Sequence, residues 1–174
     1  MSNNFLIREA KKEEYKRVGE IMVKAYASLS GFLSIEESPE YYNKLANVGD
    51  IISSKSIKLF VASTSNNEIG GAVVYFGDMK YYGSGGMAPK VHNAAGFRFL
   101  AVDEKYRGHS LGRLLSEHCL QKAQKEGANE LIIHTTEAMK LAWGMYERIG
   151  FKRSEDLDFS KGNLKVYGFR FPFV

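Results

Sequence analysis

Between residues 106 and 115 the chain reads Tyr106-Arg107-Gly108-His109-Ser110-Leu111-Gly112-Arg113-Leu114-Leu115. An apolar run from Phe97 to Val102 precedes this stretch and predicts a buried strand, and a helical pattern continues after it to Glu126. A tight basic turn therefore joins a strand to the N-terminus of a helix. The first turn of a helix leaves backbone N–H groups unpaired, and the helix dipole adds positive potential there. This combination predicts a binding site for a phosphate or pyrophosphate group.

The glycines and arginines of this stretch lead to the same prediction. Gly108 and Gly112 let a ligand and a neighbouring backbone come close, and Arg107 and Arg113 add positive charge on either side. Two common nucleotide sites are excluded. Gly112 is followed by Arg113-Leu114 and not by the Lys-Ser/Thr pair of a P-loop, and the full Gly-x-Gly-x-x-Gly pattern of a dinucleotide site is absent.

Length and composition limit the class of protein. The 174 residues, 44% of them hydrophobic and 25% charged, predict one compact domain over residues 1–174. The net charge of +4 is too small and too scattered to indicate nucleic-acid binding. The single cysteine, Cys119, cannot form an internal disulfide, and the chain has neither a membrane-length apolar run nor the apolar core of a signal peptide. We therefore expect a cytoplasmic protein that binds neither nucleic acid nor a membrane.

The apolar pattern predicts the order of elements along the chain. Alternating and β-branched runs indicate strands at residues 5–8, 57–64, 69–76, 94–102, 130–135, 151–159 and 164–171. Apolar residues at helical spacing indicate helices at residues 11–29, from Ser38-Pro39 onward, at 111–126 and at 138–149. Residues 77–93, rich in glycine and tyrosine, are expected to form a long loop, either at the surface or as a flap over a binding site. This order predicts a mixed α/β domain with one sheet.

Two motifs resemble one known family. The stretch from Val102 to Leu115 resembles the acetyl-coenzyme A (acetyl-CoA) signature of the GNAT acetyltransferase superfamily, in which Arg or Gln, two residues, Gly or Ala, one residue and Gly or Ala follow a strand that ends in valine. Downstream, Ala142 and the run Tyr146-Glu147-Arg148-Ile149-Gly150-Phe151 resemble the family's helix that ends in a Tyr-Glu-Lys-Leu-Gly-Phe-like sequence. The resemblance covers nearly the whole chain. It implies a mostly antiparallel central sheet of about seven strands, splayed in the middle, with about four flanking helices.

The chain departs from the family pattern at two positions. Ser110 stands where the family usually has glycine or alanine, but serine is small and its N–H is still available. Met139, three residues before Ala142, stands where the family often has asparagine. One side-chain contact to the coenzyme or the substrate could therefore be missing.

The resemblance implies where coenzyme A binds. The sheet would open between the strand that ends at Val102 and the strand from Leu131 to Thr135, so that main-chain groups lose their strand partner and pair with the amides of a pantetheine arm. The pyrophosphate would lie on the basic turn. The residues assigned to acetyl-CoA are Leu100, Ala101, Val102, Arg107, Gly108, His109, Ser110, Leu111, Gly112 and Arg113, and no metal ion is expected.

Acetyl transfer requires a neutral amine and a proton donor for the leaving thiolate. A lysine-like amine, with a pKa of ~10.4, is almost entirely protonated at pH 7, so a base or a water relay helps. His134, on the strand across the gap, is the first candidate for that base, ahead of Glu137 and His92, although a lone histidine in an apolar strand is more often a packed residue. Tyr146 is the candidate proton donor. Tyr146 shares a helical face with apolar residues, and this spacing alone predicts that its ring packs in the core. Its match to the tyrosine of the family's helix favours a catalytic role.

These expectations describe an acetyl-CoA-dependent N-acetyltransferase that moves an acetyl group to a primary amine by direct attack. The acceptor would be a small-molecule or peptide amine. The alternative is a non-catalytic acyl-CoA-binding or sensing domain, favoured by Met139 and by the lack of a carboxylate between Phe97 and Val102. The aromatic C-terminal strand could pair across a homodimer through Tyr167, Phe169, Phe171 and Phe173.

Overall fold

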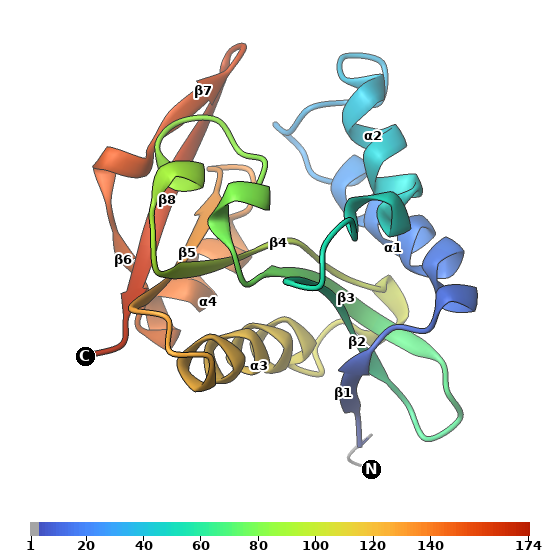
Figure 1. The fold of residues 1–174 in the computed structure, drawn as a ribbon. Helices are drawn as coiled ribbons and strands as arrows, with labels where there is room; N and C mark the ends of the chain where they lie inside the picture. The colour runs from blue at the N-terminus through green and yellow to red at the C-terminus, as the bar shows by residue number, and fades with distance from the viewer. Residues whose placement is uncertain (1–3) are drawn as a thin grey trace.

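The computed structural model describes residues 4–174 and is built around one eight-stranded sheet (Figure 1). The strands are β1 (Leu6–Glu9), β2 (Ile57–Ser63), β3 (Ile69–Phe76), β4 (Ala94–Val102), β5 (Glu130–Thr135), β6 (Lys152–Arg153), β7 (Phe159–Lys161) and β8 (Leu164–Pro172). Their order is β1-β2-β3-β4-β5-β8-β6, and β7 pairs with β8. Within residues 4–174 only β4 and β5 pair in parallel. The mixed, mostly antiparallel sheet predicted from the sequence is confirmed.

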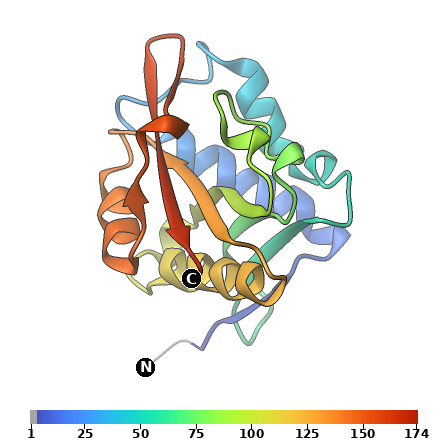
Figure 2. The ribbon, with the colours of Figure 1, turned by 60° about the vertical axis from the view of Figure 1, so that its left-hand side comes forward.

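Helices cover both faces of the sheet (Figure 2). They are α1 (Tyr15–Ala27), α2 (Pro39–Ala46), α3 (Leu111–Lys125) and α4 (Lys140–Ile149). Alternate residues of β2 divide between two apolar cores: Leu59 and Val61 belong to the core under α1 and α2, and Phe60 and Ala62 to the core under α3 and α4. In the part of the chain that the structure describes, none of the helices has the length and apolarity needed to cross a membrane.

Most elements form where the apolar pattern predicts them. The β2–β3 hairpin and the predicted helices are present, although α1 begins only after a 3-10 turn at Lys12–Glu14. The prediction of one strand over residues 151–159 is wrong, because that segment forms β6, a 3-10 turn and β7. Leu157 in this turn is fully buried and lies directly over Gly168 of β8, where any side chain would collide with it. This contact bends the chain between the two short strands.

The centre of the sheet opens because β4 and β5 diverge. Their parallel pairing ends at Gly96 and Ile132, after which β4 continues beside β3 and β5 beside β8. In β4, Phe99 and Leu100 together lie opposite Val73 of β3, and Phe99 has a φ of +61°. This arrangement is a β-bulge, which bends its strand and frees a residue from the ladder. The splayed sheet that the resemblance implies is thus present.

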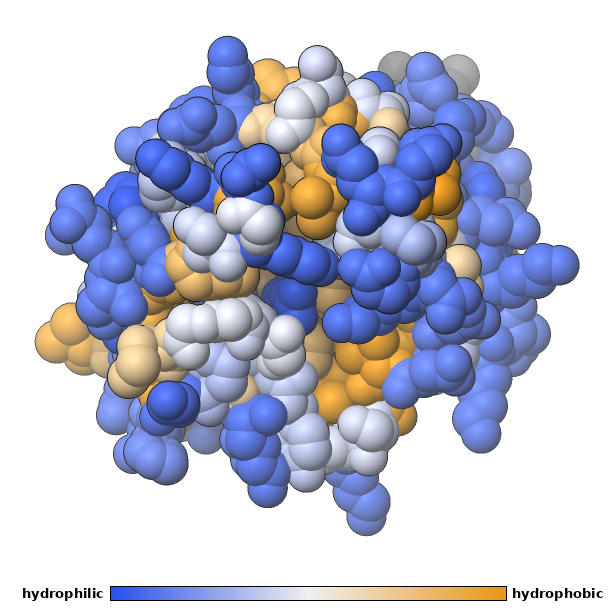
Figure 3. Space-filling view, turned by 90° about the horizontal axis from the view of Figure 1, so that it is seen from above, coloured by the Kyte–Doolittle hydropathy of each residue, from blue (hydrophilic) through white to orange (hydrophobic). Residues whose placement is uncertain are grey.

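The loop from residue 77 to residue 93 is anchored at one end of the molecule. Met79 and Tyr82 are buried, and Gly85 and Gly86 pack against Phe159 of β7. Seen from above, this end shows hydrophilic side chains gathered around recessed apolar ones (Figure 3). These contacts favour a packed surface loop over a free flap.

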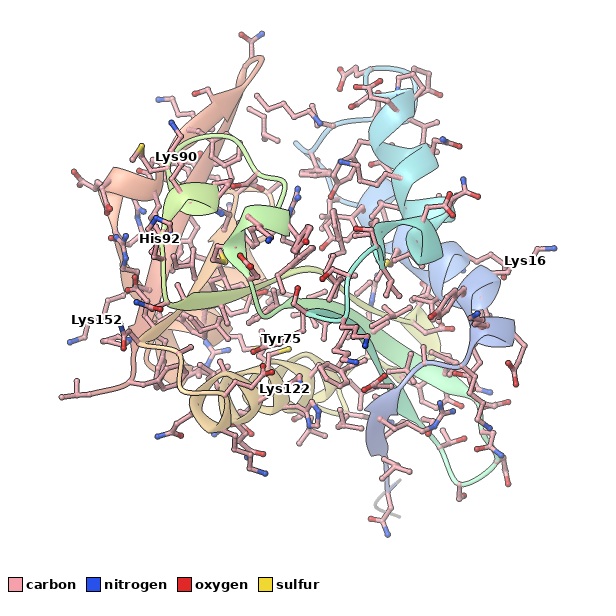
Figure 4. All side chains as sticks on the ribbon, in the orientation of Figure 1. Lys16, Tyr75, Lys90, His92, Lys122 and Lys152 are labelled. Atoms are coloured by element: carbon pink, nitrogen blue, oxygen red, sulfur yellow. The ribbon has the colours of Figure 1, made fainter. Side chains whose placement is uncertain are left out.

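A partly buried polar contact fixes α3 against β3 (Figure 4). The hydroxyl of Tyr75 donates to the carboxylate of Glu126, with 2.6 Å between the oxygens. The ammonium of Lys122 lies 5.6 Å from the centroid of the Tyr75 ring. The apolar side of the helix is buried at Leu111, Leu115, Cys119 and Ala123. α3 is therefore held along its length, with its N-terminus beside the end of β4.

The aromatic C-terminal strand β8 lies inside the sheet. It pairs with β5 on one side and with β6 and β7 on the other. Phe169 and Arg170 have strand partners on both sides, and pairing of this strand across a homodimer stays a prediction.

Candidate functional site

The opening between β4 and β5 exposes one backbone edge of β4. The N–H of Asp103 donates to the carbonyl of Gly70 on β3, at 2.8 Å. Because successive residues of a strand direct their backbone groups to opposite sides, Val102 and Leu100 direct theirs away from β3 and into the opening. The carbonyl of Leu100 does accept a hydrogen bond from that side, from the hydroxyl of Tyr26 on α1 at 2.9 Å. Main-chain groups of this edge are therefore available to a ligand.

The turn between β4 and α3 has two residues in the left-handed region. Gly108 has a φ of +84° and Ser110 a φ of +60°. That conformation is ordinary for glycine and strained for serine. Ser110 nevertheless begins the helix, since its carbonyl accepts the N–H of Leu114 at 3.0 Å. A side chain at Gly108 would meet nothing within 4 Å, so the space above the turn is open.

The N-terminus of α3 has the properties of an anion site. Within residues 4–174, no side chain caps its first N–H groups, and its first turn carries no acidic residue. Arg107 is exposed beside it. Arg113 is paired with Glu117, with 2.7 Å between Nε and Oε1. Unpaired N–H groups, the helix dipole and the Arg107 guanidinium therefore face solvent together.

The remaining residues that we predict to bind acetyl-CoA can offer a ligand backbone groups more than side-chain groups. The side chains of Ala101 and Leu111 are buried in the two cores. Gly112 faces α4, where the sulfur of Met145 lies 3.4 Å from the position a Cβ would take. His109 is exposed. The predicted positions follow one path from the open edge of β4 to the start of α3.

A groove of about 130 Å³ lies beside this path. It is lined by α1 and by residues of the segment 102–107. Arg17 of α1 is ion-paired with Asp103, and Lys24 with Glu104 at 3.4 Å. These pairs fasten α1 to the turn that leads into α3.

Two hydroxyls at the end of β5 have unmet hydrogen-bonding capacity. Thr135 and Thr136 have buried Oγ1 atoms with no hydrogen-bond partner within residues 4–174. Leaving a buried hydroxyl unpaired costs roughly 1–3 kcal/mol. Both residues follow the point where β5 has left β4.

Tyr146 packs from α4 against the splayed part of β4. Its ring meets Phe97 edge-on, with 5.9 Å between centroids. Burial raises the pKa of the Tyr146 hydroxyl well above its usual range. The pKa of Tyr26 is also raised, first by burial and then by neighbouring hydroxyls, Tyr146 among them. Tyr146 is therefore protonated at neutral pH, on the same opening as the free edge of β4.

His134 is held at both ring nitrogens. Its Nε2 donates to the carbonyl of Leu157 at 2.9 Å, so Nδ1 accepts from the hydroxyl of Tyr82, also at 2.9 Å. Burial lowers the pKa of the ring to about 4, and the ring is neutral at pH 7. These bonds tie the loop 77–93 and the turn before β7 to β5. The geometry favours a positioning role for this histidine.

The weaker candidates for a base lie in other surroundings. Glu137 accepts a hydrogen bond from the hydroxyl of Tyr167 at 3.0 Å. His92 is exposed and lies at the outer side of the molecule near Lys90 (Figure 4). Within residues 4–174, neither Glu137 nor His92 makes a contact that places it at the open edge of β4.

Several features of the site could not be found from the sequence. Tyr26 follows Met22 at helical spacing, which predicts its burial but not its hydrogen bond to Leu100. The bulge falls on Phe99, and no glycine or asparagine marks the positive φ there. Three cations that converge near the bulge come from distant parts of the chain: Lys44, Arg98 and Lys161.

Two curated proteins are similar to part of the chain. N-alpha-acetyltransferase 30 of Saccharomyces cerevisiae is 37% identical over 54 residues, which cover 31% of this chain and 31% of that protein. N-acetyltransferase 8B of Homo sapiens is 33% identical over 55 residues, which cover 32% of this chain and 24% of that protein. The matches therefore span less than a third of each relative.

Solved structures share the fold over nearly the whole chain. A GNAT-family acetyltransferase from Staphylococcus aureus Mu50 has a TM-score of 0.72 at 15% identity, covering 96% of this chain and 98% of its own. The YncA protein of Salmonella typhimurium, solved with its cofactor acetyl-CoA, has a TM-score of 0.67 at 14% identity, covering 97% and 94%. At this identity the similarity establishes the fold alone.

The family comparison covers the site itself. The model of the Acetyltransferase (GNAT) family matches residues 23–151, which are 129 of the 174 residues. That range includes the open edge of β4, the turn before α3 and Tyr146 on α4. With the splayed sheet and the anion site at the start of α3, this match shows that the chain belongs to the GNAT acetyltransferase family.

Proposed function

We propose that this protein is an acetyl-CoA-dependent N-acetyltransferase that acts on a primary amine. One observation carries the proposal: the free backbone edge of β4 leads from an opening in the sheet to an uncapped helix N-terminus beside an exposed arginine. A ligand with amides along an arm and a pyrophosphate at its end fits such a path. Membership of the family, and the acetyl-CoA bound to the Salmonella relative, support the same ligand.

The chain would hold acetyl-CoA through main-chain groups and one charged turn. Leu100 and Val102 would pair with amides of the pantetheine arm, as a neighbouring strand would. Leu100 can do so while it accepts from Tyr26, because a carbonyl oxygen has two lone pairs. The turn 107–112 would receive the pyrophosphate. Acetyl-CoA, when bound, supplies the acetyl group as a thioester.

Tyr146 would act as the hydrogen-bond donor to the leaving sulfur. In the reaction the amine nitrogen bonds to the acetyl carbon, the carbon–sulfur bond breaks, the amine loses a proton and the sulfur gains one. The Tyr146 hydroxyl is kept protonated by burial and can donate a hydrogen bond to sulfur as negative charge develops there. A buried phenolate is costly. We therefore expect the proton released by the amine to replace any proton that Tyr146 gives up.

We infer that water accepts the proton of the incoming amine. His134 would have to break a hydrogen bond to act as the base, and its lowered pKa makes it a weak one. The strand segment 97–102 contains no carboxylate. Only the small neutral fraction of an amine reacts, so the rate is expected to rise with pH towards the amine's own pKa.

One observation supports an alternative, a non-catalytic acyl-CoA-binding or sensing domain. Met139 precedes α4 and packs against the apolar core, at the position where the family often carries asparagine. A thioether cannot donate a hydrogen bond. A chain that lacks this contact could bind the coenzyme without turning it over.

Release of free thiol from acetyl-CoA, measured with a broad panel of amines, tests the proposal. We expect release that depends on the amine, together with an acetylated product identified by its mass. Binding of acetyl-CoA without amine-dependent release across the panel would favour the alternative. Absence of acetyl-CoA binding would contradict both.

A further inference from the structure

A guanidinium group lies beside the bulge in β4, on the side of the sheet covered by α1 and α2. Arg98 donates from Nη1 to the carbonyl of Tyr82 at 2.7 Å, and its guanidinium carbon lies 4.5 Å from the centroid of the Phe99 ring. One carbonyl and two aromatic rings hold the group in place. The remaining N–H groups of the guanidinium fork can bind another acceptor.

Two lysines approach the same place from other elements. Lys161, at the end of β7, places its ammonium 5.0 Å from the centroid of the Tyr41 ring on α2. The Tyr41 ring in turn packs against Phe99, with 6.1 Å between centroids. Lys44 lies on α2 as well, and its charge interacts with those of Arg98 and Lys161. We call Lys44, Arg98 and Lys161 the cation cluster.

The cation cluster has no carboxylate partner of its own. Within residues 4–174 none of the three side chains forms an ion pair. The pKa of Lys44 is lowered, first by partial burial of its ammonium and then by the other two charges. The pKa of the exposed Glu40 carboxylate is lowered first by hydrogen bonds from its own backbone and from Ser38, and least by the charge of Lys161. Like charges held together in this way are relieved when an anion binds.

The cation cluster lies next to the opening of the sheet. Arg98 directly precedes the bulge, and the Tyr41 ring packs against Tyr26, whose hydroxyl reaches the open edge at Leu100. α2 and the β7–β8 hairpin stand on either side of the upper end of the molecule (Figure 1), where hydrophilic side chains surround recessed apolar ones (Figure 3). A small molecule bound there would be a neighbour of the proposed transfer site.

We propose that the cation cluster binds a carboxylate of the acceptor, so that the amine acetylated by this protein is that of an amino acid. This inference rests on the N-acetyltransferase function proposed above. The planar fork of Arg98 matches the two oxygens of a carboxylate, and the lysines add charge. The rings of Tyr41 and Phe99 provide apolar surface for the carbon skeleton between the two groups. A polyamine would be repelled by the same three charges.

Paired acceptors and paired variants test the assignment. The specificity constant kcat/KM is measured for the amino acid that reacts best in a panel of the common ones, and for its amide, which lacks the carboxylate. The variants are Lys44→Gln and Lys161→Gln, both at exposed positions, with Lys16→Gln as control because Lys16 points into solvent from α1 (Figure 4). Each amine keeps its own pKa in every variant, so the acid-to-amide ratio isolates the carboxylate contact.

We expect the acid-to-amide ratio to fall roughly tenfold in Lys44→Gln and in Lys161→Gln through a higher KM for the acid, and to stay unchanged in Lys16→Gln. Equal ratios in all variants, or better transfer to polyamines than to any amino acid, would overturn the carboxylate site and leave acetyl transfer standing. Absence of thiol release with every amine would overturn the proposed function and this inference with it.

Discussion

Burial acts on Tyr146 and His134 in opposite directions. It raises the pKa of the phenol and lowers that of the imidazole, because in each case it disfavours the charged form. Both side chains are therefore neutral at pH 7. Tyr146 keeps a proton that it can share with a leaving group. His134 has no free ring nitrogen and serves better as a fixed link between Tyr82 and Leu157.

Removing one oxygen from Tyr146 tests its role. We expect Tyr146→Phe to lower kcat on the order of a hundredfold while the Kd of acetyl-CoA changes little, since the ring still packs and only the donor to sulfur is lost. Steady-state kinetics and calorimetric binding measure the two effects. Tyr75→Phe is the matched control, because Tyr75 is also buried but contacts Glu126 on α3. Unchanged turnover in Tyr146→Phe would remove this residue from the mechanism.

His134 makes the stability of the fold depend on pH. Its pKa is about 4 in the folded protein and ~6.5 in the unfolded chain, so between these values the unfolded chain binds more protons. The contribution to the free energy of unfolding is complete above about pH 6.5 and is lost as the pH falls towards 4, by up to roughly 3 kcal/mol. Urea unfolding at about pH 7 and about pH 4.5 should show a smaller loss in His134→Gln than in the natural chain. The same loss in both would contradict the assignment.

At the level of whole elements, the start of α3 is set up for an external anion. Its uncapped N–H groups, the exposed Arg107 and the open space above Gly108 lie together. A carboxylate placed at Ser110 would add a negative charge at this site from within the chain. Helix stability and coenzyme binding should then respond in opposite directions.

Ser110→Asp and Ser110→Asn separate these two effects. Both residues adopt the left-handed conformation of Ser110 more readily than serine does, so neither should be less stable than the natural chain. Only aspartate brings a negative charge, and we expect it to raise the Kd of coenzyme A about tenfold relative to asparagine, with a smaller difference at high salt. Calorimetric titration at two salt concentrations measures this. Equal Kd values would place the pyrophosphate elsewhere.

Local sequence patterns predict most of the fold, and within the site they predict the part that lies in consecutive residues. Helical spacing and alternation locate the strands and helices, and the stretch from Tyr106 to Leu115 carries the anion site in consecutive residues. Contacts between distant segments are not marked by any local sequence pattern. The burial of Leu157 over Gly168 breaks a strand that the local pattern predicts, and the bulge at Phe99 has no local signal. No local pattern predicts the cation cluster either, because its members are scattered over α2, β4 and β7.

For the molecule as a whole, the opening between β4 and β5 connects the two faces of the sheet. α3 and α4 bring the anion site and Tyr146 from one face. α1 and α2, with the β7–β8 hairpin, bring Tyr26, the aromatic rings and the cation cluster from the other. The coenzyme and its acceptor would thus approach the opening from opposite faces and meet where the strands part.

Hydrogen exchange of backbone amides, followed with and without acetyl-CoA, tests this arrangement most directly. We expect acetyl-CoA to slow exchange at residues 108–113 and at Leu100 and Val102, because these N–H groups would bind the pyrophosphate and the pantetheine arm. The outer strand β1 should show no change. Saturating acetyl-CoA that protects other segments and leaves residues 100–114 unchanged would contradict the central claim.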